Sequence, residues 1–395
     1  MRVGLETTIS QHGENRFLSL VMRSLRPSRR ATRKGFGWYT IPIRYAGRPT
    51  DMPFLFIPSR GCRFDYSGAC TMCNFGAGAM TSDVDIVEFV CRQASAHRNS
   101  PCIFITTSGS FLDDSEISPS LRLELLSLLG SLGYQTIATE SRPEFITESS
   151  VRLARSALSS AVELEIGIGV ESANPWIRRN CVNKMLSDSE IDRAIAACHD
   201  TGASVYVHVL LKPPFLCEGE AVADATETLI RYHSAGADRL GVGLMSVKAN
   251  TLTHWLWQRG MYEPPTYWSA AAVIKRLPEA IRGSVGLFGF DSSTPVTVFS
   301  GNCTSCGETA RKLLFDFCHR AAIDPIESLL GLDCTCRAHW EQTMHPPDEP
   351  LRLRVARSYS SIAEGIFGEP WWLANRQWIE IELDTDPSAP CHVVQ

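Results

Sequence analysis

Three cysteines near the start of the chain have the residue type and the spacing that metal chemistry needs. Cys62, Cys70 and Cys73 are separated by seven and two residues in the segment IPSRGCRFDYSGACTMCNFGAG. Thiolates bind zinc and iron–sulfur clusters, and a structural zinc ion normally takes four protein ligands. Because no fourth cysteine or histidine lies in this segment, the pattern favours a cluster with one open iron that binds a second molecule. Inert buried thiols, or three ligands of a four-ligand zinc site, are the alternatives.

A second group of cysteines lies towards the other end of the chain. Cys303 and Cys306 are separated by two residues, and Cys334 and Cys336 by one. Two close pairs on either side of a helical stretch commonly assemble a four-thiolate site. We interpret the group as a structural zinc site, with an auxiliary iron–sulfur cluster as the alternative, because thiolates suit both metals. The other seven of the 14 cysteines show no partner spacing and are predicted to be buried or incidental thiols: Cys91, Cys102, Cys181, Cys198, Cys217, Cys318 and Cys391.

The composition is that of a globular chain, with 395 residues, of which 44% are hydrophobic and 21% charged. Such a chain buries a sizeable core, which excludes disorder as its main state. The formal net charge of −5 argues against a protein whose main task is to grip phosphate backbones. The sequence shows no secretory signal and no apolar run as long as a membrane span. We therefore predict a cytoplasmic protein without membrane contact, in which clustered cysteines bind metal more often than they form disulfides.

From about residue 51 onwards, short apolar runs alternate with longer amphipathic stretches. The predicted strands are 53–59, 102–108, 135–141, 161–172, 204–214 and 239–247, and the predicted helices are 86–97, 118–133, 146–158, 187–202 and 219–236. Strands that alternate with helices form βαβ units and a parallel sheet. Six such strands predict an α/β fold with an open or partial barrel. In that architecture, the loops at the carboxyl ends of the strands carry the chemistry.

We expect three parts along the chain. Residues 1–50 form an N-terminal extension with a basic arm, residues 51–300 the core barrel, and residues 301–395 a cysteine-rich C-terminal domain. The basic residues of the arm are Arg23, Arg26, Arg29, Arg30, Arg33 and Lys34. We interpret the arm as a solvated, partly mobile segment, and the alternative is a contact for an anionic substrate or partner.

Small residues end the second predicted strand at Ser108, Gly109 and Ser110. A turn of this kind exposes backbone groups to a zwitterionic ligand, although an ordinary tight turn has the same sequence. Asn183 and Lys184 fall on a loop or early helix over the mouth of the barrel, where they would contact substrate or solvent. His208 lies within a predicted strand, a position more typical of a satisfied core residue than of a ligand.

Polar residues also end the later predicted strands. Glu140 and Arg142 follow the third strand. A carboxylate there suits ribose hydroxyls and a guanidinium suits a carboxylate, with a strand-end ion pair as the alternative. Glu171 and Ser172 end the fourth strand and are similar candidates for ribose. Lys212 ends an apolar strand, where a charge is costly unless it meets a ligand or a carboxylate.

With three cysteines in the loop after the first predicted strand, the chain resembles the radical S-adenosylmethionine (SAM) superfamily. The resemblance implies a partial (βα)6 barrel of the TIM type and a 4Fe-4S cluster on these cysteines. The unique iron of such a cluster chelates the amino and carboxylate groups of SAM, and one electron then releases a 5′-deoxyadenosyl radical. The spacing C-x7-C-x2-C is wider than the commonest one, C-x3-C-x2-C. Met72 stands where an aromatic adenine contact is usual, and Phe75 lies close to it.

Further motifs look like the branch that contains the radical SAM subunit of archaeosine synthase. They are TSGSFLDDSEI (107–117), TESRPEFIT (139–147), GIGVESANPWIRRNCVNKM (167–185), HVLLKPPF (208–215) and SVKANTLTHWLWQRGMYEPPTYWS (246–269). The resemblance covers about residues 50–340. It implies that the turn at 108–110 binds the methionyl amino group of SAM, and that relatives carry a similar C-terminal cysteine pattern.

We therefore expect a radical SAM enzyme with a flavodoxin- or ferredoxin-type reductant protein as its partner. By analogy with the branch, the substrate is a lysine-bearing 7-deazaguanine nucleoside in tRNA. The acidic net charge and the lack of an appended RNA-binding domain make a small natural-product intermediate an equal candidate. The alternative from another class is a non-catalytic scaffold that binds zinc or RNA.

Overall fold

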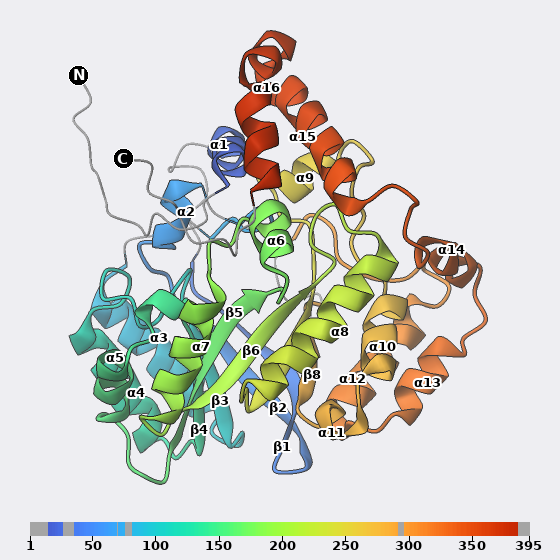
Figure 1. The fold of residues 1–395 in the computed structure, drawn as a ribbon. Coiled ribbons are helices and arrows are strands. Elements are labelled where there is room, and N and C mark those ends of the chain that lie inside the picture. Colours follow the sequence, from blue (N-terminus) through green and yellow to red (C-terminus); the bar gives the residue numbers. More distant parts are fainter. Residues whose placement is uncertain (1–14, 27–34, 69, 76–80, 291–295, 386–395) are drawn as a thin grey trace, which may run out of the picture.

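The computed structural model describes residues 15–26, 35–68, 70–75, 81–290 and 296–385. Its centre is one eight-stranded sheet in which the strands follow one another in chain order (Figure 1). The strands are β1 (Gly37–Tyr45), β2 (Arg48–Phe56), β3 (Cys102–Thr106), β4 (Thr136–Glu140), β5 (Glu163–Glu171), β6 (Ser204–Leu211), β7 (Arg239–Leu244) and β8 (Val285–Phe288). β1 runs antiparallel to β2, and every later pair of neighbours is parallel.

The six predicted strands correspond to β2 to β7, and the predicted α/β fold with a partial TIM-type barrel is confirmed. The sheet has one more strand at each edge. β1 joins β2 through a hairpin whose turn residues, Ala46 and Gly47, have φ of 47° and 77°. Positive φ at both positions is typical of a type I′ turn. β8 has only four residues, too few to stand out as an apolar run. The division at residues 50 and 300 stays a prediction.

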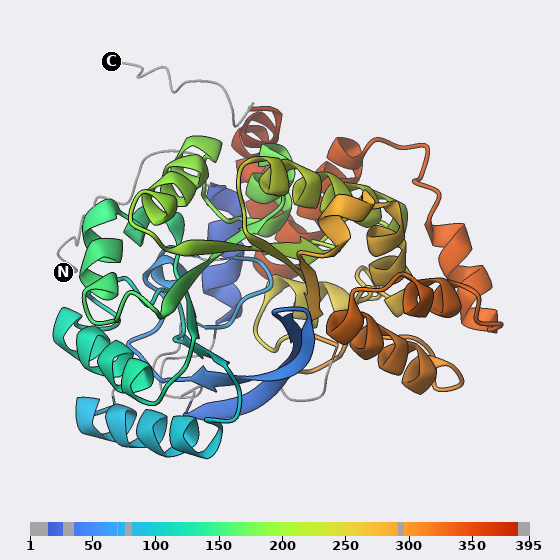
Figure 2. The ribbon, with the colours of Figure 1, turned by 90° about the horizontal axis from the view of Figure 1, so that it is seen from below.

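Helices lie on the outer side of the curved sheet, as Figure 2 shows from below. The main ones are α3 (Asp83–Ala96), α4 (Pro119–Ser131), α5 (Glu148–Arg155), α7 (Asp188–His199), α8 (Glu218–Ser234) and α10 (Tyr267–Arg276). Ser82, Ser118, Thr147 and Ser187 each accept a hydrogen bond from a backbone N–H in the first turn of the following helix. Such caps satisfy donors that have no partner within the helix, which fixes where the helices begin. The first five of these helices are the predicted ones.

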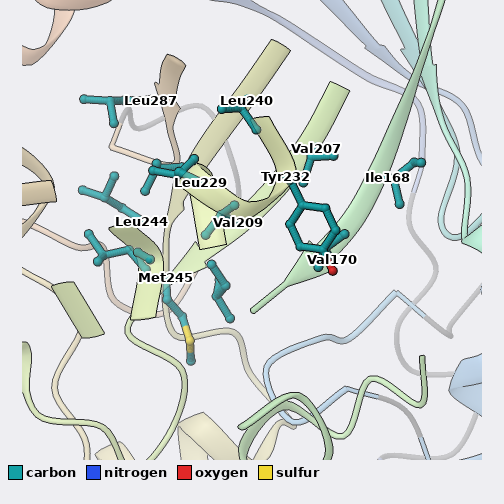
Figure 3. Packing of buried hydrophobic residues seen from close by; sticks show 14 of the residues in the cluster. Ile168, Val170, Val207, Val209, Leu229, Tyr232, Leu240, Leu244, Met245 and Leu287 are labelled. Atoms are coloured by element: carbon teal, nitrogen blue, oxygen red, sulfur yellow. The ribbon is translucent and has the colours of Figure 1, made fainter. Parts of the chain in front are cut away.

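The main core lies between the outer face of the sheet and these helices. Figure 3 shows aliphatic side chains of β5, β6 and β7, such as Ile168, Val207 and Leu240, with Leu229 and Tyr232 of α8. Successive side chains of a strand point to opposite faces. In β5 and β7 the large aliphatic residues therefore lie on the outer face, and the alternate residues are left to line the lumen of the barrel.

A group of C-terminal helices completes the molecule. They are α12 (Gly307–Arg320), α13 (Asp324–Leu330), α14 (Thr335–Thr343), α15 (Leu351–Phe367) and α16 (Glu369–Asp384). α12 contacts β1, β2 and β8, so it covers the side where the first and last strands of the sheet face each other. α15 packs on α16 and on α1 (Arg16–Leu25). Figure 1 shows α15 and α16 together above the sheet.

Short elements connect these parts. They are α2 (Arg63–Ser67), η1 (Pro143–Phe145), α6 (Pro175–Ile177), η2 (Arg178–Val182), α9 (Leu252–Trp257) and α11 (Glu279–Arg282). Within the described residues, no helix combines the length and the apolar character that a membrane crossing needs. Residues 27–34 of the predicted basic arm, and Cys391, lie outside the described part of the chain.

Candidate functional site

The three N-terminal cysteines line a cavity of about 400 Å³. Cys62 precedes the short helix α2, and Cys70 and Cys73 follow it. The backbone N–H of Cys73 donates to the carbonyl of Cys70 at 3.1 Å, and the N–H of Thr71 donates to the carbonyl of Val182 at 2.9 Å. These bonds anchor the loop, so the protein itself brings the three thiols to one cavity.

Cys70 is buried, and Cys62 and Cys73 are half-buried. Burial raises the pKa of Cys62 to about 12 and that of Cys70 to about 11. Nearby cations act in the opposite direction: Arg142 lowers the pKa of Cys62, and Lys184 lowers that of Cys70. The free thiols of Cys62 and Cys70 are therefore protonated at neutral pH, and a metal that binds them displaces their protons. Three soft ligands around one cavity fit an iron–sulfur cluster with one open iron.

Charged side chains from the ends of β4 and β5 line the same cavity. They include Glu140, Arg142, Glu171 and Lys184. Lys184 Nζ lies 2.8 Å from Glu171 Oε1. Burial alone would lower the pKa of Lys184, but Glu171 raises it above its ordinary value, so the ammonium stays charged. The hydroxyl of Thr106 donates to Glu140. Both signs of charge are thus available to a zwitterionic ligand.

Arg142 is held above the ring of Phe64. Its guanidinium carbon lies 4.1 Å from the ring centroid, and its Nε donates to Glu144 at 2.5 Å. A second set of bonds, at 3.3 Å, runs from its terminal nitrogens to the carbonyl of Lys184. A guanidinium fixed in this way is oriented before any ligand arrives, which is the arrangement that binds a carboxylate well.

The turn after β3 brings the backbone of Gly109 close to the backbone of Cys62. A Cβ on Gly109 would lie 2.7 Å from the Cα of Cys62 and 2.2 Å from Oε1 of Glu116, so only glycine fits there. Ser108 lines the cavity, and its buried Oγ has no hydrogen-bond partner in the described part of the chain. A buried hydroxyl without a partner costs about 1–3 kcal/mol. This hydroxyl therefore indicates where a ligand atom belongs.

Met72 and Phe75 also line the cavity, close to the last cysteine of the loop. The Nζ of Lys248 lies 4.4 Å from the centroid of the Phe75 ring. Phe56 faces the same ring with its centroid 6.1 Å away. The wall here is apolar and aromatic, which suits a planar heterocycle.

Three predicted site residues have partners inside the protein and do not line the cavity. Ser110 Oγ accepts a hydrogen bond from the backbone N–H of Arg142 at 3.1 Å. Ser172 Oγ donates to Asp224 at 2.6 Å. Lys212 Nζ lies 2.9 Å from Glu218 Oε1, in a buried ion pair. A direct contact of these three side chains with a cofactor stays a prediction.

Glu116 is a site residue to which the sequence analysis assigned no role. Its Oε1 accepts from the N–H of Ser110 at 3.0 Å, and its Oε2 accepts from the hydroxyl of Ser59 at 3.1 Å. It therefore joins the end of β2 to the turn after β3. Burial raises the pKa of Glu116 to about 8. The residue lies within the motif at 107–117, but its distance from Ser59 in the sequence gives no signal of this contact.

The four C-terminal cysteines come together between two helices. Cys303 and Cys306 lie at the start of α12, and Cys334 and Cys336 at the start of α14. The sulfur–sulfur distances are 3.8 Å for 303–306, 3.3 Å for 303–334, 3.5 Å for 306–336 and 3.5 Å for 334–336. A tetrahedral metal with bonds of about 2.3 Å to sulfur places its ligands about 3.8 Å apart. The four thiols therefore fit one metal ion.

Hydrogen-bond donors next to this second group of cysteines contact its sulfur atoms. Hydrogen bonds, first of all from the backbone N–H of Cys306, lower the pKa of Cys303 to about 6. Asn302 Nδ2 donates to the sulfur of Cys306 at 3.5 Å. In the described residues these four cysteines are the only group of metal-binding side chains whose ligand atoms all lie within 4.8 Å of one another. The three cysteines at the cavity are spread more widely.

Comparison with known proteins gives one clear resemblance. The chain is 29% identical over 300 residues to the archaeosine synthase subunit beta of Methanosarcina acetivorans, covering 73% of this chain and 84% of that protein. This confirms the resemblance predicted from the motifs. No protein-family model matches the chain.

Two solved structures are similar at low identity. Elp3 of Methanocaldococcus infernus has a TM-score of 0.44 and 18% identity, covering 68% of this chain and 67% of that one. Coproporphyrinogen III oxidase of Escherichia coli, described as a radical SAM enzyme, has a TM-score of 0.38 and 18% identity, covering 59% and 52%.

Proposed function

We propose that this relative of archaeosine synthase subunit beta is a radical SAM enzyme whose 4Fe-4S cluster is held by Cys62, Cys70 and Cys73. With SAM on its open iron, such a cluster supplies by reductive cleavage a 5′-deoxyadenosyl radical that abstracts hydrogen from a substrate. The observation that carries the proposal is the convergence of these three cysteines with the polar ends of β3, β4 and β5 on one cavity.

Different residues around the cavity would then bind different parts of SAM. The turn at Ser108 and Gly109 would receive the amino group, and Arg142 would pair with the carboxylate. Glu140 and Glu171 would accept hydrogen bonds from ribose hydroxyls. The apolar wall of Met72 and Phe75 would contact the adenine, as the resemblance implies. The predicted cofactor contacts of Ser110, Ser172 and Lys212, which do not line the cavity, would require these side chains to leave their protein partners.

For the second group of cysteines we propose a structural zinc ion. The short sulfur–sulfur distances support a single ion. An auxiliary iron–sulfur cluster would have to fit its own atoms between the thiolates, which requires wider spacing. A closed four-thiolate zinc site has no open position and no redox chemistry. Its role would be to hold α12 and α14 together.

The proposed substrate is a modified nucleoside of tRNA or a small natural-product intermediate. The name of the relative supports the first and also an additional protein subunit as a partner. A flavodoxin- or ferredoxin-type protein would supply the electron, and the reaction would take place in the cytoplasm. A titration with bulk tRNA at several salt concentrations separates the two substrates, because phosphate contacts make binding depend on salt.

The decisive experiment measures 5′-deoxyadenosine after anaerobic reconstitution with iron and sulfide, with dithionite as reductant. We expect about four irons per chain at the first site and formation of 5′-deoxyadenosine. The triple change Cys62→Ser, Cys70→Ser, Cys73→Ser should abolish both, and Cys91→Ser, at an exposed cysteine, is the matched control. Activity that survives the triple change contradicts the proposal. Zinc without iron would support the non-catalytic scaffold instead.

A further inference from the structure

We infer that the lumen of the barrel is a binding chamber for a small organic acid with an apolar body. The inference rests on the proposed function, because it identifies the occupant as the molecule that donates hydrogen. The cavity that holds the three cysteines continues through the barrel. Arg239 at the start of β7 and Leu244 at its end both line it, as do Val285 and Phe288 of β8.

Glycines on the inner face explain why this lumen is hollow. In most TIM barrels, bulky branched side chains fill the centre. Here the register places five glycines on the lumen side of the sheet: Gly167, Gly169, Gly241, Gly243 and Gly286. The alternate residues of β5 and β7, such as Ile166 and Val242, are large and face the helices.

Aromatic side chains contact two of these glycines at the position where a Cβ would stand. A Cβ on Gly241 would lie 1.7 Å from the hydroxyl of Tyr206, and one on Gly243 would lie 2.7 Å from the ring of Phe288. A Cβ on Gly286 would meet no atom within 4 Å. Open space therefore borders the inner face of β8, on the side towards β1.

The opposite wall is aromatic and aliphatic. Tyr39, Phe54 and Phe104 stack across β1, β2 and β3, with ring centroids 4.7 and 4.8 Å apart. Ile43 and Met52 line the cavity beside them. A wall of this kind releases water to an apolar ligand and offers few hydrogen bonds, so it indicates the nature of the ligand body.

Two polar side chains that line the cavity are available to a ligand. The buried Nε2 of His208 has no hydrogen-bond partner within the described residues and lies 3.8 Å from Glu140 Oε2. Arg44 donates to the carbonyl of Gly283, and among the described residues it forms no ion pair with a carboxylate. Arg239, in contrast, is paired with Glu165 at 3.1 Å. Arg44 is therefore a cation that an acidic group of the ligand would meet at this end of the cavity, and Lys248, beside the ring of Phe75, is the other lining cation without an ion pair in the described part of the chain.

The size of the ligand follows from how the chamber is closed. The strands β1 and β8 are not paired, but α12 covers the space between them. Cys318 Sγ lies 3.7 Å from the carbonyl of Leu287, and His319 Nε2 lies 3.4 Å from Asp51 Oδ1. These contacts tie α12 to both edges of the sheet. A closed side wall suits a small molecule and not a polymer.

The test is a fluorescence titration of the full chain under anaerobic conditions. The probes are 1-anilinonaphthalene-8-sulfonate and N-phenyl-1-naphthylamine, which has the same ring body without the acid. We expect both to bind saturably, one per chain. Gly286→Leu fills the open space and should weaken both by about tenfold or more, while Gly35→Leu, at an exposed glycine, should change neither. Arg44→Met should weaken only the sulfonate, by about fivefold.

Ile43→Phe is a second filling variant for the case in which Gly286→Leu does not fold. Binding that neither filling variant changes would overturn the inference, as would displacement of the probe by bulk tRNA. The same samples are assayed for 5′-deoxyadenosine without added substrate. Saturable probe binding without that product contradicts the proposed function and leaves the chamber standing. Product formation without saturable binding overturns the chamber alone.

Discussion

The two groups of cysteines use the same side chain in opposite surroundings. Cys303, Cys306, Cys334 and Cys336 approach one another to 3.3–3.8 Å. Hydrogen-bond donors lower the pKa of Cys303 to about 6, whereas burial raises that of Cys306. The thiols of the other group stand on the wall of a cavity, and burial raises the pKa of two of them. One group has the geometry to enclose a single metal ion, and the other leaves open space beside its thiols.

This difference separates two uses of a metal. A site closed by four protein ligands stabilises a fold, because nothing else reaches the ion. A site with three ligands beside a polar cavity exposes a metal position to a second molecule. The important difference is what lies at the fourth ligand position of a bound metal. In the C-terminal group it is another sulfur, and in the N-terminal group it is the cavity lined by Ser108, Arg142 and Glu171.

The largest expected effect comes from changing one cysteine in each group. Cys70→Ser should remove the iron and reduce 5′-deoxyadenosine formation by about a hundredfold or more, with little change in the thermal midpoint. Cys336→Ser should remove zinc and lower the midpoint by roughly 5 °C, with formation of the product retained. Metal analysis, calorimetry and product assay check both. If Cys336→Ser abolishes the product without loss of stability, the two sites do not differ in the way proposed.

A smaller effect is expected at the turn that faces the first group. Gly109→Ala places a methyl group 2.7 Å from the Cα of Cys62, so the loop must shift. Overpacking of this kind costs about 1–3 kcal/mol, and product formation should fall about tenfold to a hundredfold. Gly35→Ala, at an exposed position with no atom within 4 Å, is the control. An unchanged rate would show that the turn is not in contact with the reacting site.

Removal of the second metal should loosen only the elements that it joins. With a chelator, amide exchange in α12 and α14 should accelerate by about tenfold, since local opening there costs less. Exchange in β3, β4 and β5 should stay the same. Hydrogen exchange with mass spectrometry measures both. Acceleration throughout the barrel would mean that the metal supports the whole fold.

The smallest effect concerns a single hydroxyl. Ser108 Oγ has no protein partner in the described residues, so Ser108→Ala should raise the free energy of unfolding of the ligand-free protein by about 1–3 kcal/mol. If the hydroxyl bonds SAM, its loss should weaken binding of SAM by about fivefold, equal to about 1 kcal/mol. Equilibrium binding of SAM to the reconstituted protein measures this. Equal affinity in the variant would remove Ser108 from the proposed site.

Local patterns predicted much of this structure. Apolar runs of ordinary length predicted β2 to β7, and capping residues such as Ser118 and Ser187 marked the starts of helices. The close spacing within Cys303–Cys306 and Cys334–Cys336 predicted that the four thiols meet. These features depend on neighbours in the sequence, which is why the sequence alone reveals them.

Features that depend on distant contacts were missed. For Lys212 the sequence left a ligand or a carboxylate open, and the path of the chain after β6 shows that the carboxylate of Glu218 pairs with it. Glu116 acts on Ser59 across 57 residues. The strands GIGVE and RLGVGL were interpreted as continuously apolar. Their alternation of glycine with larger residues was the available signal for a hollow lumen.

One helix, α12, runs from the C-terminal group of cysteines to the barrel cavity. α12 has 14 residues and so is about 21 Å long. Cys306 stands at its first end, and Cys318, near its last, lines the barrel cavity. A rigid rod transmits a tilt from one end to the other. If the four thiolates hold the proposed zinc ion, the ion that fixes the first end of this helix also fixes the barrel wall at its other end.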